Sequence, residues 1–505
     1  MNMTELKFTS PEFLFMFLPA SIGLVWICHR FFGRTAGILA LIVASFTFYL
    51  SWETWGSLVL AASVGVNYSL ARFIASTGRS WDRSVALGVG VAGNLAGLAY
   101  FKYRNFLVAS FTSFLGLDSE VARIAPILAI SFYTFQQIAF LVDTYQGKMN
   151  RIPFADYLIS VLFFPHLVSG PLLHYKSIIS QFETRFRVSW YTINAGFPLL
   201  MMGLAKKVAI ADPIMRFSNP LYAKAETGAL TFFEAWGAAL GFTAQLYFDF
   251  SGYSDMALGI GLMFGIALPV NFFSPYKATS IIEFWRRWHI TLSNFLRDYL
   301  YIPLGGGRVG PVRRYANLMI VMVLGGLWHG PSWTFVFWGL LHGSFLVINH
   351  LWRKVSSGFS KGIDHFLRPG YAVLTFLCVV IAWVFFKATT FQGALTVLSG
   401  MFHPQVIGLP GELAQISFLS GISGISWGGG MKYADFLTFW PLVIMAFIIA
   451  WLLPNSVEIF GVDGEKVIVQ RQLKFARIAA VTCLIWVSAF GVFGSAPSEF
   501  LYFQF

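Results

Sequence analysis

The chain has 505 residues, of which 57% are hydrophobic and only 11% are charged, and its formal net charge is +12. A soluble domain of this size carries roughly 25% charged residues, so the composition excludes a soluble protein and predicts an integral membrane protein whose surroundings are the lipid bilayer. Lys and Arg in cytoplasmic loops explain the positive charge, and we expect no nucleic-acid partner.

Apolar runs that lack Asp, Glu, Lys and Arg recur along the whole chain. Because a helix needs about 20 apolar residues to cross the hydrocarbon core, these runs predict roughly eleven to thirteen membrane helices, including re-entrant segments. We expect an all-α polytopic protein with a single membrane domain over 1–505, a core at about 125–350 and C-terminal helices at about 369–498. The runs are 13–28, 35–52, 54–71, 84–101, 124–142, 157–175, 188–205, 235–248, 256–276, 315–352, 369–386, 436–457 and 478–498.

The distribution of Lys and Arg predicts the orientation of the chain, because cytoplasmic loops carry an excess of both. Basic residues occupy the first and third short loops, at 30–34 and 72–83, so the N-terminus is expected outside. The loop at 388–435 has one Lys and 458–477 has four basic residues, which places the C-terminus outside as well. Residues 102–123 break this alternation, and we expect an interfacial helix there. The distribution of Lys and Arg does not determine how residues 157–255 cross the membrane.

The run 315–352 contains three histidines, His329, His342 and His350, and is flanked at both ends by a basic pair. Both ends are therefore expected on the cytoplasmic side. As a single helix the 38 residues would be about 57 Å long, too long for one crossing. We predict a hairpin that turns at Gly330-Pro331 and places His329 at its tip, inside the membrane.

Spacing alone leaves two interpretations of His329 open. It is either a tip histidine bonded to a backbone carbonyl that Gly330 and Pro331 leave unpaired, or a general base. Burial disfavours the charged imidazolium, and neutral imidazole is the form that takes a proton from an attacking hydroxyl.

The stretch EFWRRWHITLSNFLRDYLYIPLGGG, residues 283–307, gathers charged and aromatic side chains. At helical spacing Trp285 and His289 share a face with two leucines, and Glu283 pairs with Arg287. One interpretation is an amphipathic cytoplasmic helix. The other is a polar mouth in which Arg286 and Arg287 bind an anionic ligand, such as the phosphates of a nucleotide-bearing donor, and His289 faces the site.

Two further segments hold polar groups between apolar runs. In QLYFDFSGYSDMALGIG, Asp249 and Asp255 lie near Tyr253 in the sequence. One interpretation is that either carboxylate orients His329 or His289. The other is a glycine-broken turn with Asp caps. In FFPHLVSGPLLH, two prolines, a glycine and two histidines, His166 among them, interrupt a span, which indicates a re-entrant segment that lines a cavity.

No motif with metal-ligand spacing occurs, and we expect no metal site and no tightly bound cofactor. The three cysteines lie inside apolar runs, where we expect them to be packing residues.

Five strings together resemble the bacterial membrane-bound O-acyltransferases, in particular the alginate O-acetyltransferase subgroup. They are ISFYTFQQIAFLVDTY, FFPHLVSGPLLH, AQLYFDFSGYSDMALGIGLMFG, EFWRRWHITLSNFLRDYLYIPLGG and LGGLWHG. The resemblance implies a ring of tilted helices around a membrane tunnel, with His329 as the catalytic histidine and His289 as its partner. It also implies a multi-pass protein of the bacterial inner membrane that takes acetyl from cytoplasmic acetyl-CoA. A periplasmic acetyltransferase partner then completes transfer to an exported polysaccharide.

From the residues and the resemblance together, we expect catalysis by His329 and His289. We expect donor or substrate contacts from the side chains Arg286, Arg287, Trp285, Trp328, Asp249, Tyr253, Asp255 and His166. Peptidoglycan, cellulose and carrier-dependent D-alanyl transfer stay open as alternatives, and so does a transporter of a polysaccharide or lipid intermediate. The loop at 388–435 is expected either to dock the partner or to cap a crevice.

Overall fold

The computed structural model describes residues 5–117, 124–149, 152–173, 175–358, 361–403, 406–416, 424–463, 466–467, 475–494, 498 and 500–501. The chain divides into two compact units. The first comprises Met1–Leu204, Tyr253–Val270 and Phe460–Phe505, and the second Ala205–Gly252 and Asn271–Ile459. Helices dominate both units, and the strands in the described ranges form two small two-stranded sheets.

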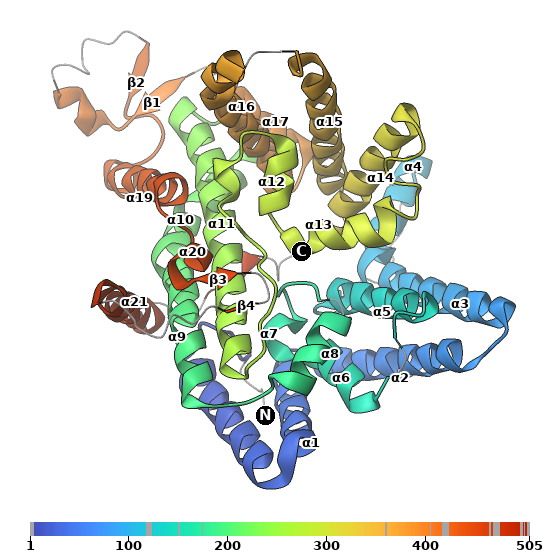
Figure 1. Ribbon diagram of the computed structural model, residues 1–505. Helices are drawn as coiled ribbons and strands as arrows, with labels where there is room; N and C mark the ends of the chain where they lie inside the picture. Colours follow the sequence, from blue (N-terminus) through green and yellow to red (C-terminus); the bar gives the residue numbers. More distant parts are fainter. Residues whose placement is uncertain are drawn as a thin grey trace. The chain divides into compact units, whose positions relative to one another are not determined.

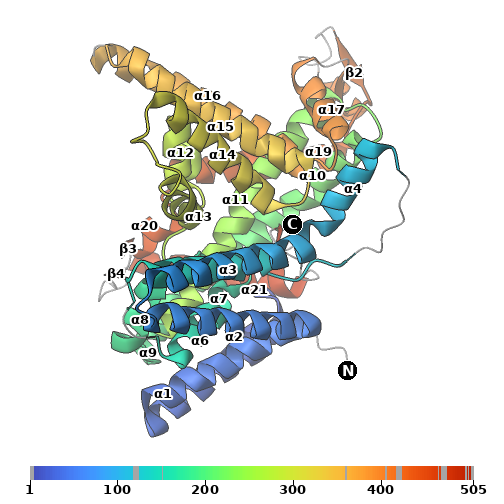
Figure 2. The same ribbon diagram turned by 90° about the vertical axis from the view of Figure 1, so that its right-hand side faces the viewer.

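The first unit is built from the N-terminal helices, most of α9 and α21 near the C-terminus (Figure 1). The helices α2, α3 and α5 lie side by side in both views (Figures 1 and 2). Its elements are η1 (Glu12–Phe17), α1 (Leu18–Trp52), α2 (Thr54–Ser76), α3 (Ser80–Leu98), η2 (Ala99–Tyr103), α4 (Arg104–Leu115), α5 (Ile130–Tyr145), α6 (Phe154–Leu162), α7 (Phe164–Leu167), α8 (Tyr175–Thr184), α9 (Trp190–Ala205), β3 (Val462–Asp463), β4 (Lys466–Val467) and α21 (Phe475–Gly494).

The second unit contains a helical hairpin, α14–α15, and α16 packs beside it (Figure 2). The helix α11 (Phe232–Met263) begins in this unit and passes into the first at Tyr253. The other elements are η3 (Lys206–Ala211), α10 (Asp212–Ala225), η4 (Pro275–Lys277), α12 (Ile281–Arg287), α13 (Ile290–Leu296), η5 (Arg297–Tyr301), α14 (Pro311–His329), α15 (Trp333–Ser356), α16 (Lys361–Lys387), α17 (Phe391–Phe402), β1 (Ile407–Leu409), η6 (Gly411–Gln415), β2 (Ile425–Trp427), α19 (Tyr433–Leu452) and α20 (Ser456–Phe460).

The expectation of an all-α polytopic membrane protein is confirmed. Within the described ranges, seven helices are long and apolar enough to cross a membrane: Glu12–Trp52, Thr54–Ser76, Ser80–Leu115, Trp190–Ala225, Trp333–Ser356, His365–Lys387 and Tyr433–Leu452. This count is below the eleven to thirteen elements expected, because the structure joins some apolar runs and breaks others. The runs 13–28 and 35–52, for example, form one helical stretch that kinks at Gly33, where φ is 86°.

Two sequence interpretations were wrong at the level of local structure. Residues 245–261 are not a glycine-broken turn, since α11 continues through them as one helix of 32 residues. Residues 283–296 are not one helix, since α12 ends at Arg287 and α13 begins at Ile290. Trp285 and His289 therefore do not share a helical face.

Three other expectations concern helix breaks and loops. The segment 157–173 is interrupted as expected, since α6 ends at Leu162 and only the four-residue α7 follows. A helix, α4, occupies the start of the 102–123 segment. The 388–435 segment is more ordered than a loop, since it contains α17 and the parallel pair β1–β2, although 404–405 and 417–423 lie outside the described residues.

Candidate active site

The predicted hairpin is confirmed, and His329 is the last residue of its first helix, α14. Pro331 disfavours a helical conformation at Gly330, whose backbone is extended, so α14 ends there. Ser332 then starts α15, because its side chain accepts a hydrogen bond from the Thr334 N–H. The short connection holds His329 at the tip of the hairpin, and this side chain is only 4% exposed.

The two helices of the hairpin approach closely because glycines face backbone atoms at their contact. A Cβ atom added to Gly326 would lie 2.2 Å from the Phe335 carbonyl oxygen, and one added to Gly339 would lie 2.3 Å from the Met322 carbonyl oxygen. Small residues allow such backbone-to-backbone approach between membrane helices. Gly326 lies three residues, less than one turn, from His329 along α14, so its contact with α15 fixes the position of the imidazole.

Aromatic rings surround the His329 imidazole. The ring centroids of Trp328, Trp338 and Phe386 lie 4.9, 5.0 and 5.1 Å from its own centroid, all in edge-on geometry. These rings come from α14, α15 and α16. Such a surrounding is apolar and of low dielectric.

His289 lies between α12 and α13 in the left-handed conformation, with φ 42° and ψ 53°. A left-handed non-glycine residue costs of order 1–3 kcal/mol and persists only where the surroundings hold it. Asn271 does so twice, because its carbonyl oxygen accepts from the Ile290 N–H at 3.0 Å and its side-chain oxygen meets His289 Nδ1 at 3.1 Å. His289 is completely buried.

The hydrogen bonds around Asn271 determine the tautomer of His289. Asn271 Oδ1 also accepts from the backbone N–H of Thr291 at 3.3 Å and from its hydroxyl at 2.9 Å. Since a backbone N–H is only a donor, the atom facing it is the amide oxygen, and His289 Nδ1 must carry a proton to donate to it. The basic nitrogen of the neutral ring is therefore Nε2.

Trp328 connects the two histidines. Its ring centroid lies 6.0 Å from that of His289 and 4.9 Å from that of His329. The sequence expectation that both histidines and Trp328 belong to one site agrees with this proximity, although their chemical roles stay predictions.

A third buried histidine, His342, belongs to the same aromatic cluster and was absent from the predicted site. The Trp285 indole N–H donates to His342 Nδ1 at 3.3 Å, and Trp338 lies between His342 and His329, with ring centroids 4.8 and 5.0 Å away. Because Nδ1 accepts, Nε2 of the neutral ring carries the proton, and this buried N–H has no hydrogen-bond partner among the described residues. The available signal was the i,i+4 spacing of Trp338 and His342 in a run without charges.

The two adjacent arginines have different surroundings. Arg287 pairs with Glu283 at 2.8 Å, as the i,i+4 spacing predicted, and also donates to the Phe273 carbonyl oxygen. Arg286 is exposed. Burial opposes ionisation of Glu283, but hydrogen bonds from Thr279 and Arg287 outweigh it and lower the pKa of this carboxyl. Of the pair, Arg286 thus presents the more accessible guanidinium.

Asp249 is engaged in an ion-pair cluster. Its carboxylate lies 2.5 Å from the ammonium of Lys207, which also lies 2.8 Å from Asp212. Asp249 and Lys207 are 2% and 0% exposed. The next residue on α11, Phe250, packs edge-on against His289 with ring centroids 4.9 Å apart. The ion pair therefore anchors the part of α11 that contacts His289.

The remaining predicted side chains belong to the first unit. Tyr253 stacks on Phe8 with ring centroids 5.1 Å apart, and Asp255 is 5% exposed. His166 is buried. Its Nδ1 lies 3.1 Å from the side-chain amide nitrogen of Gln136, and its Nε2 lies 3.1 Å from the Ser160 carbonyl oxygen. Within the second unit the structure brings together His289, Trp328, His329 and, through Trp338 and His342, Trp285.

Comparison with known proteins identifies the family. Residues 116–388, which include all the histidines above, match the membrane-bound O-acyltransferase family. The chain is 36% identical to the peptidoglycan O-acetyltransferase of Helicobacter pylori, with 99% of this chain and 98% of that protein covered. It is 41% identical to the probable alginate O-acetylase AlgI of Pseudomonas aeruginosa, with 78% and 74% covered. The chain belongs to the membrane-bound O-acyltransferase family.

Another relative is named for the transfer of a different acyl group, D-alanyl. The chain is 28% identical to the teichoic acid D-alanyltransferase of Streptococcus thermophilus, with 46% of this chain and 59% of that protein covered. The chain is therefore an acyltransferase. It is a multi-pass membrane protein of the bacterial membrane-bound O-acyltransferase family. Sequence reasoning missed Asn271 and Phe386, because their neighbours His289 and His329 lie far away in the chain, and it also missed Trp338 and His342.

Proposed function

We propose that this acyltransferase takes an acetyl group from cytoplasmic acetyl-CoA and passes it across the bacterial inner membrane for O-acetylation of an exported polysaccharide. The observation that carries the proposal is the buried histidine pair of the second unit. His329 and His289 flank one indole ring, Trp328, and each has a defined structural anchor.

His329 acts as the general base. It takes the proton of the acceptor hydroxyl, the oxygen attacks the thioester carbonyl, the carbon–sulfur bond breaks, and the proton passes to the departing thiolate of CoA. The aromatic surroundings of His329 support this role, since they exclude the water that would hydrolyse the thioester. In a second route His329 itself carries the acetyl group; protein-bound radiolabel that hydroxylamine removes would distinguish this route from direct transfer.

His289 orients the reacting thioester. Its tautomer supports this role, because Nδ1–H is held by Asn271 and Nε2 remains the basic nitrogen. Arg286 binds the phosphates of the donor, since Arg287 is engaged with Glu283 whereas Arg286 is exposed. Trp285 supports the site through its bond to His342.

Two acceptors are supported by different relatives. Alginate is supported by the probable alginate O-acetylases, of which the P. aeruginosa protein is 41% identical to this chain. Peptidoglycan is supported by the H. pylori relative, whose match covers 99% of this chain and thus includes the helices beyond residue 388. Comparison of acetyl content in the exopolysaccharide and in muropeptides from one deletion strain decides between them.

A periplasmic acetyltransferase completes the transfer. We place its docking surface on the 388–435 segment, which has only one basic residue and is expected outside. Both termini are expected on the same, periplasmic side.

The experiment measures transfer from acetyl-CoA labelled in its acetyl group to polymer in membranes that contain the wild type or His329→Ala at equal protein levels. The proposal expects label in the polymer for the wild type only. Label transfer by His329→Ala at the wild-type rate would refute the role of this residue. Polymer that crosses vesicle membranes without label transfer would instead favour a transporter.

A further inference from the structure

The two histidines of the proposed reaction belong to separate elements of the second unit, so contacts between these elements set their separation. His329 ends α14 in the helical hairpin, whereas His289 follows α12. The helix α12 has only seven residues, about 10 Å of helix, and a helix this short is not stable by itself. Its position therefore depends on its packing against other elements, among them α15 of the hairpin (Figure 2).

Two polar side chains of α15 hold α12. His342 Nδ1 accepts a hydrogen bond from the Trp285 indole N–H at 3.3 Å, and the Phe284 ring stacks on the same imidazole with ring centroids 6.1 Å apart. Asn349 Oδ1 accepts from the Ile282 N–H at 3.4 Å. His342 and Asn349 are seven residues apart, about two helical turns, so they lie on the same face of α15. This face of α15 therefore determines where α12 lies.

The hydrogen bond between Trp285 and His342 lies close to both histidines of the proposed reaction. Trp285 precedes His289 by four residues. On the hairpin, the Trp338 ring lies between the imidazoles of His342 and His329, with ring centroids 4.8 and 5.0 Å away. A change in the bond between Trp285 and His342 is therefore expected to move His289 relative to His329.

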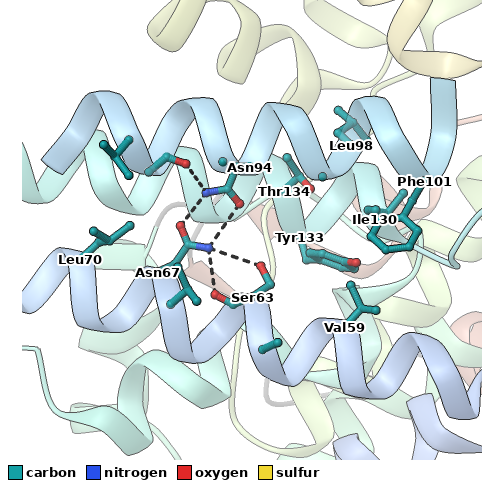
Figure 3. A pocket seen from close by; sticks show the side chains of 16 residues that line it. Val59, Ser63, Asn67, Leu70, Asn94, Leu98, Phe101, Ile130, Tyr133 and Thr134 are labelled. Carbon is teal, nitrogen blue, oxygen red and sulfur yellow. Dashed lines mark hydrogen bonds between the residues drawn. The ribbon is translucent and has the colours of Figure 1, made fainter. Parts of the chain in front are cut away.

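A hydrogen-bonded pair in the first unit shows how a structural contact between two membrane helices is built. Asn67 of α2 and Asn94 of α3 exchange two hydrogen bonds, at 2.6 and 3.3 Å, and Asn67 also donates to the Ser63 carbonyl oxygen (Figure 3). His342 differs, because it is completely buried and its Nε2–H has no hydrogen-bond partner among the described residues. A buried unpaired N–H costs stability, and proteins retain such groups mainly at functional sites. A role in stability alone therefore does not explain this imidazole.

We propose that His342 is a positioning residue for acyl transfer, because its Nδ1 fixes Trp285. Through Trp285 it sets the place of Arg286 and His289 relative to the hairpin. The inference rests on the proposed function, which assigns donor binding to Arg286 and chemistry to His289 and His329. In this role His342 contacts no reacting atom, and its contribution is geometric. A displacement of about 1 Å at the reacting groups costs about 10²-fold in rate.

The test compares two side chains of the same branched shape at position 342. His342→Asn keeps a hydrogen-bond acceptor near the place of Nδ1, whereas His342→Leu has none. Among the surrounding aromatic rings leucine is the more stable of the two, because burial of the asparagine amide costs free energy. We expect His342→Leu to lower acetyl transfer per folded molecule about 10²-fold and His342→Asn to lose less than about tenfold, although His342→Asn has the lower melting temperature. A role in stability alone would give the opposite order of activities.

Trp285→Phe removes the other half of the hydrogen bond. It should lower transfer to the same extent as His342→Leu, and the double variant should lose no more than either single variant, because both changes break one interaction. Equal transfer by His342→Leu and His342→Asn, or additive losses in the double variant, would overturn the positioning role. His329→Ala in the same assay tests the proposed function separately, since transfer by this variant at the wild-type rate would refute the function and not the order of the variants at position 342.

Discussion

Substitution of Gly326 by alanine tests whether the hairpin positions His329, the histidine that we propose to be catalytic. The added Cβ would lie 2.2 Å from the Phe335 carbonyl oxygen and 3.1 Å from Gly339 Cα and N. All three are backbone atoms of α15, so no side-chain rotation relieves the contact. Ordinary van der Waals contact begins at 3.4 Å, so α14 and α15 must separate by about 1.2 Å at this level.

The magnitude follows from two opposing effects. Overpacking of a close contact costs about 1–3 kcal/mol, whereas glycine to alanine within a helix gains up to about 1 kcal/mol. A net loss of roughly 0–3 kcal/mol leaves the protein folded. The displacement of His329, three residues along α14, has a larger effect, because a misplacement of about 1 Å costs about 10²-fold in rate.

The assay is acetyl transfer per folded molecule, with the folded fraction taken from size exclusion and melting temperature. Gly325→Ala is the control, since its Cβ would meet only the flexible end of Leu296 at 3.2 Å. We expect Gly325→Ala to keep close to wild-type activity and Gly326→Ala to lose about 10²-fold. Equal activity of the two variants would refute the reasoning.

Three further substitutions test other parts of the account. Asn271→Ala removes the acceptor that fixes the tautomer of His289, and we expect transfer to fall about 10- to 100-fold; wild-type rates in membranes would contradict this. Lys207→Met leaves Asp249 buried without its cation and should destabilise the fold by about 3–5 kcal/mol in denaturant titrations, whereas a neutral effect would argue against the anchor. Glu283 has a pKa below its ordinary value of 4.5, so its ionised form stabilises the fold above that pH and the contribution is lost as the pH falls through the lowered pKa. The melting temperature of Glu283→Gln should therefore fall less than that of the wild type on acidification, and parallel curves would exclude this contribution.

The hairpin around His329 could be predicted from sequence because charge and length constrain it. Basic pairs at both ends of 315–352 require both ends on one side, and only Gly330-Pro331 breaks the run near its middle. The helices α14 and α15 begin and end as this reasoning requires.

The surroundings of His289 could not be predicted in the same way. Its left-handed backbone depends on Asn271, 18 residues earlier, and no local pattern in RRWHITLS indicates that the helix breaks there. Likewise, the sequence left open a glycine-broken turn in 245–261, but α11 continues through this segment because helical hydrogen bonds satisfy the backbone where water is absent. A pairing with a residue distant in the chain decided the first case, and local helical hydrogen bonds decided the second.

The most direct measurement of the central claim is the acetyl content of the exported polymer in cells whose only copy of the gene encodes His329→Ala. Protein levels must match the wild type, and His350→Ala serves as the control, since this histidine lies beside Arg314 at the other end of the hairpin. We predict that His329→Ala lowers transfer by about 10²- to 10⁴-fold and that His350→Ala does not. Normal acetylation in the His329→Ala cells would contradict the account.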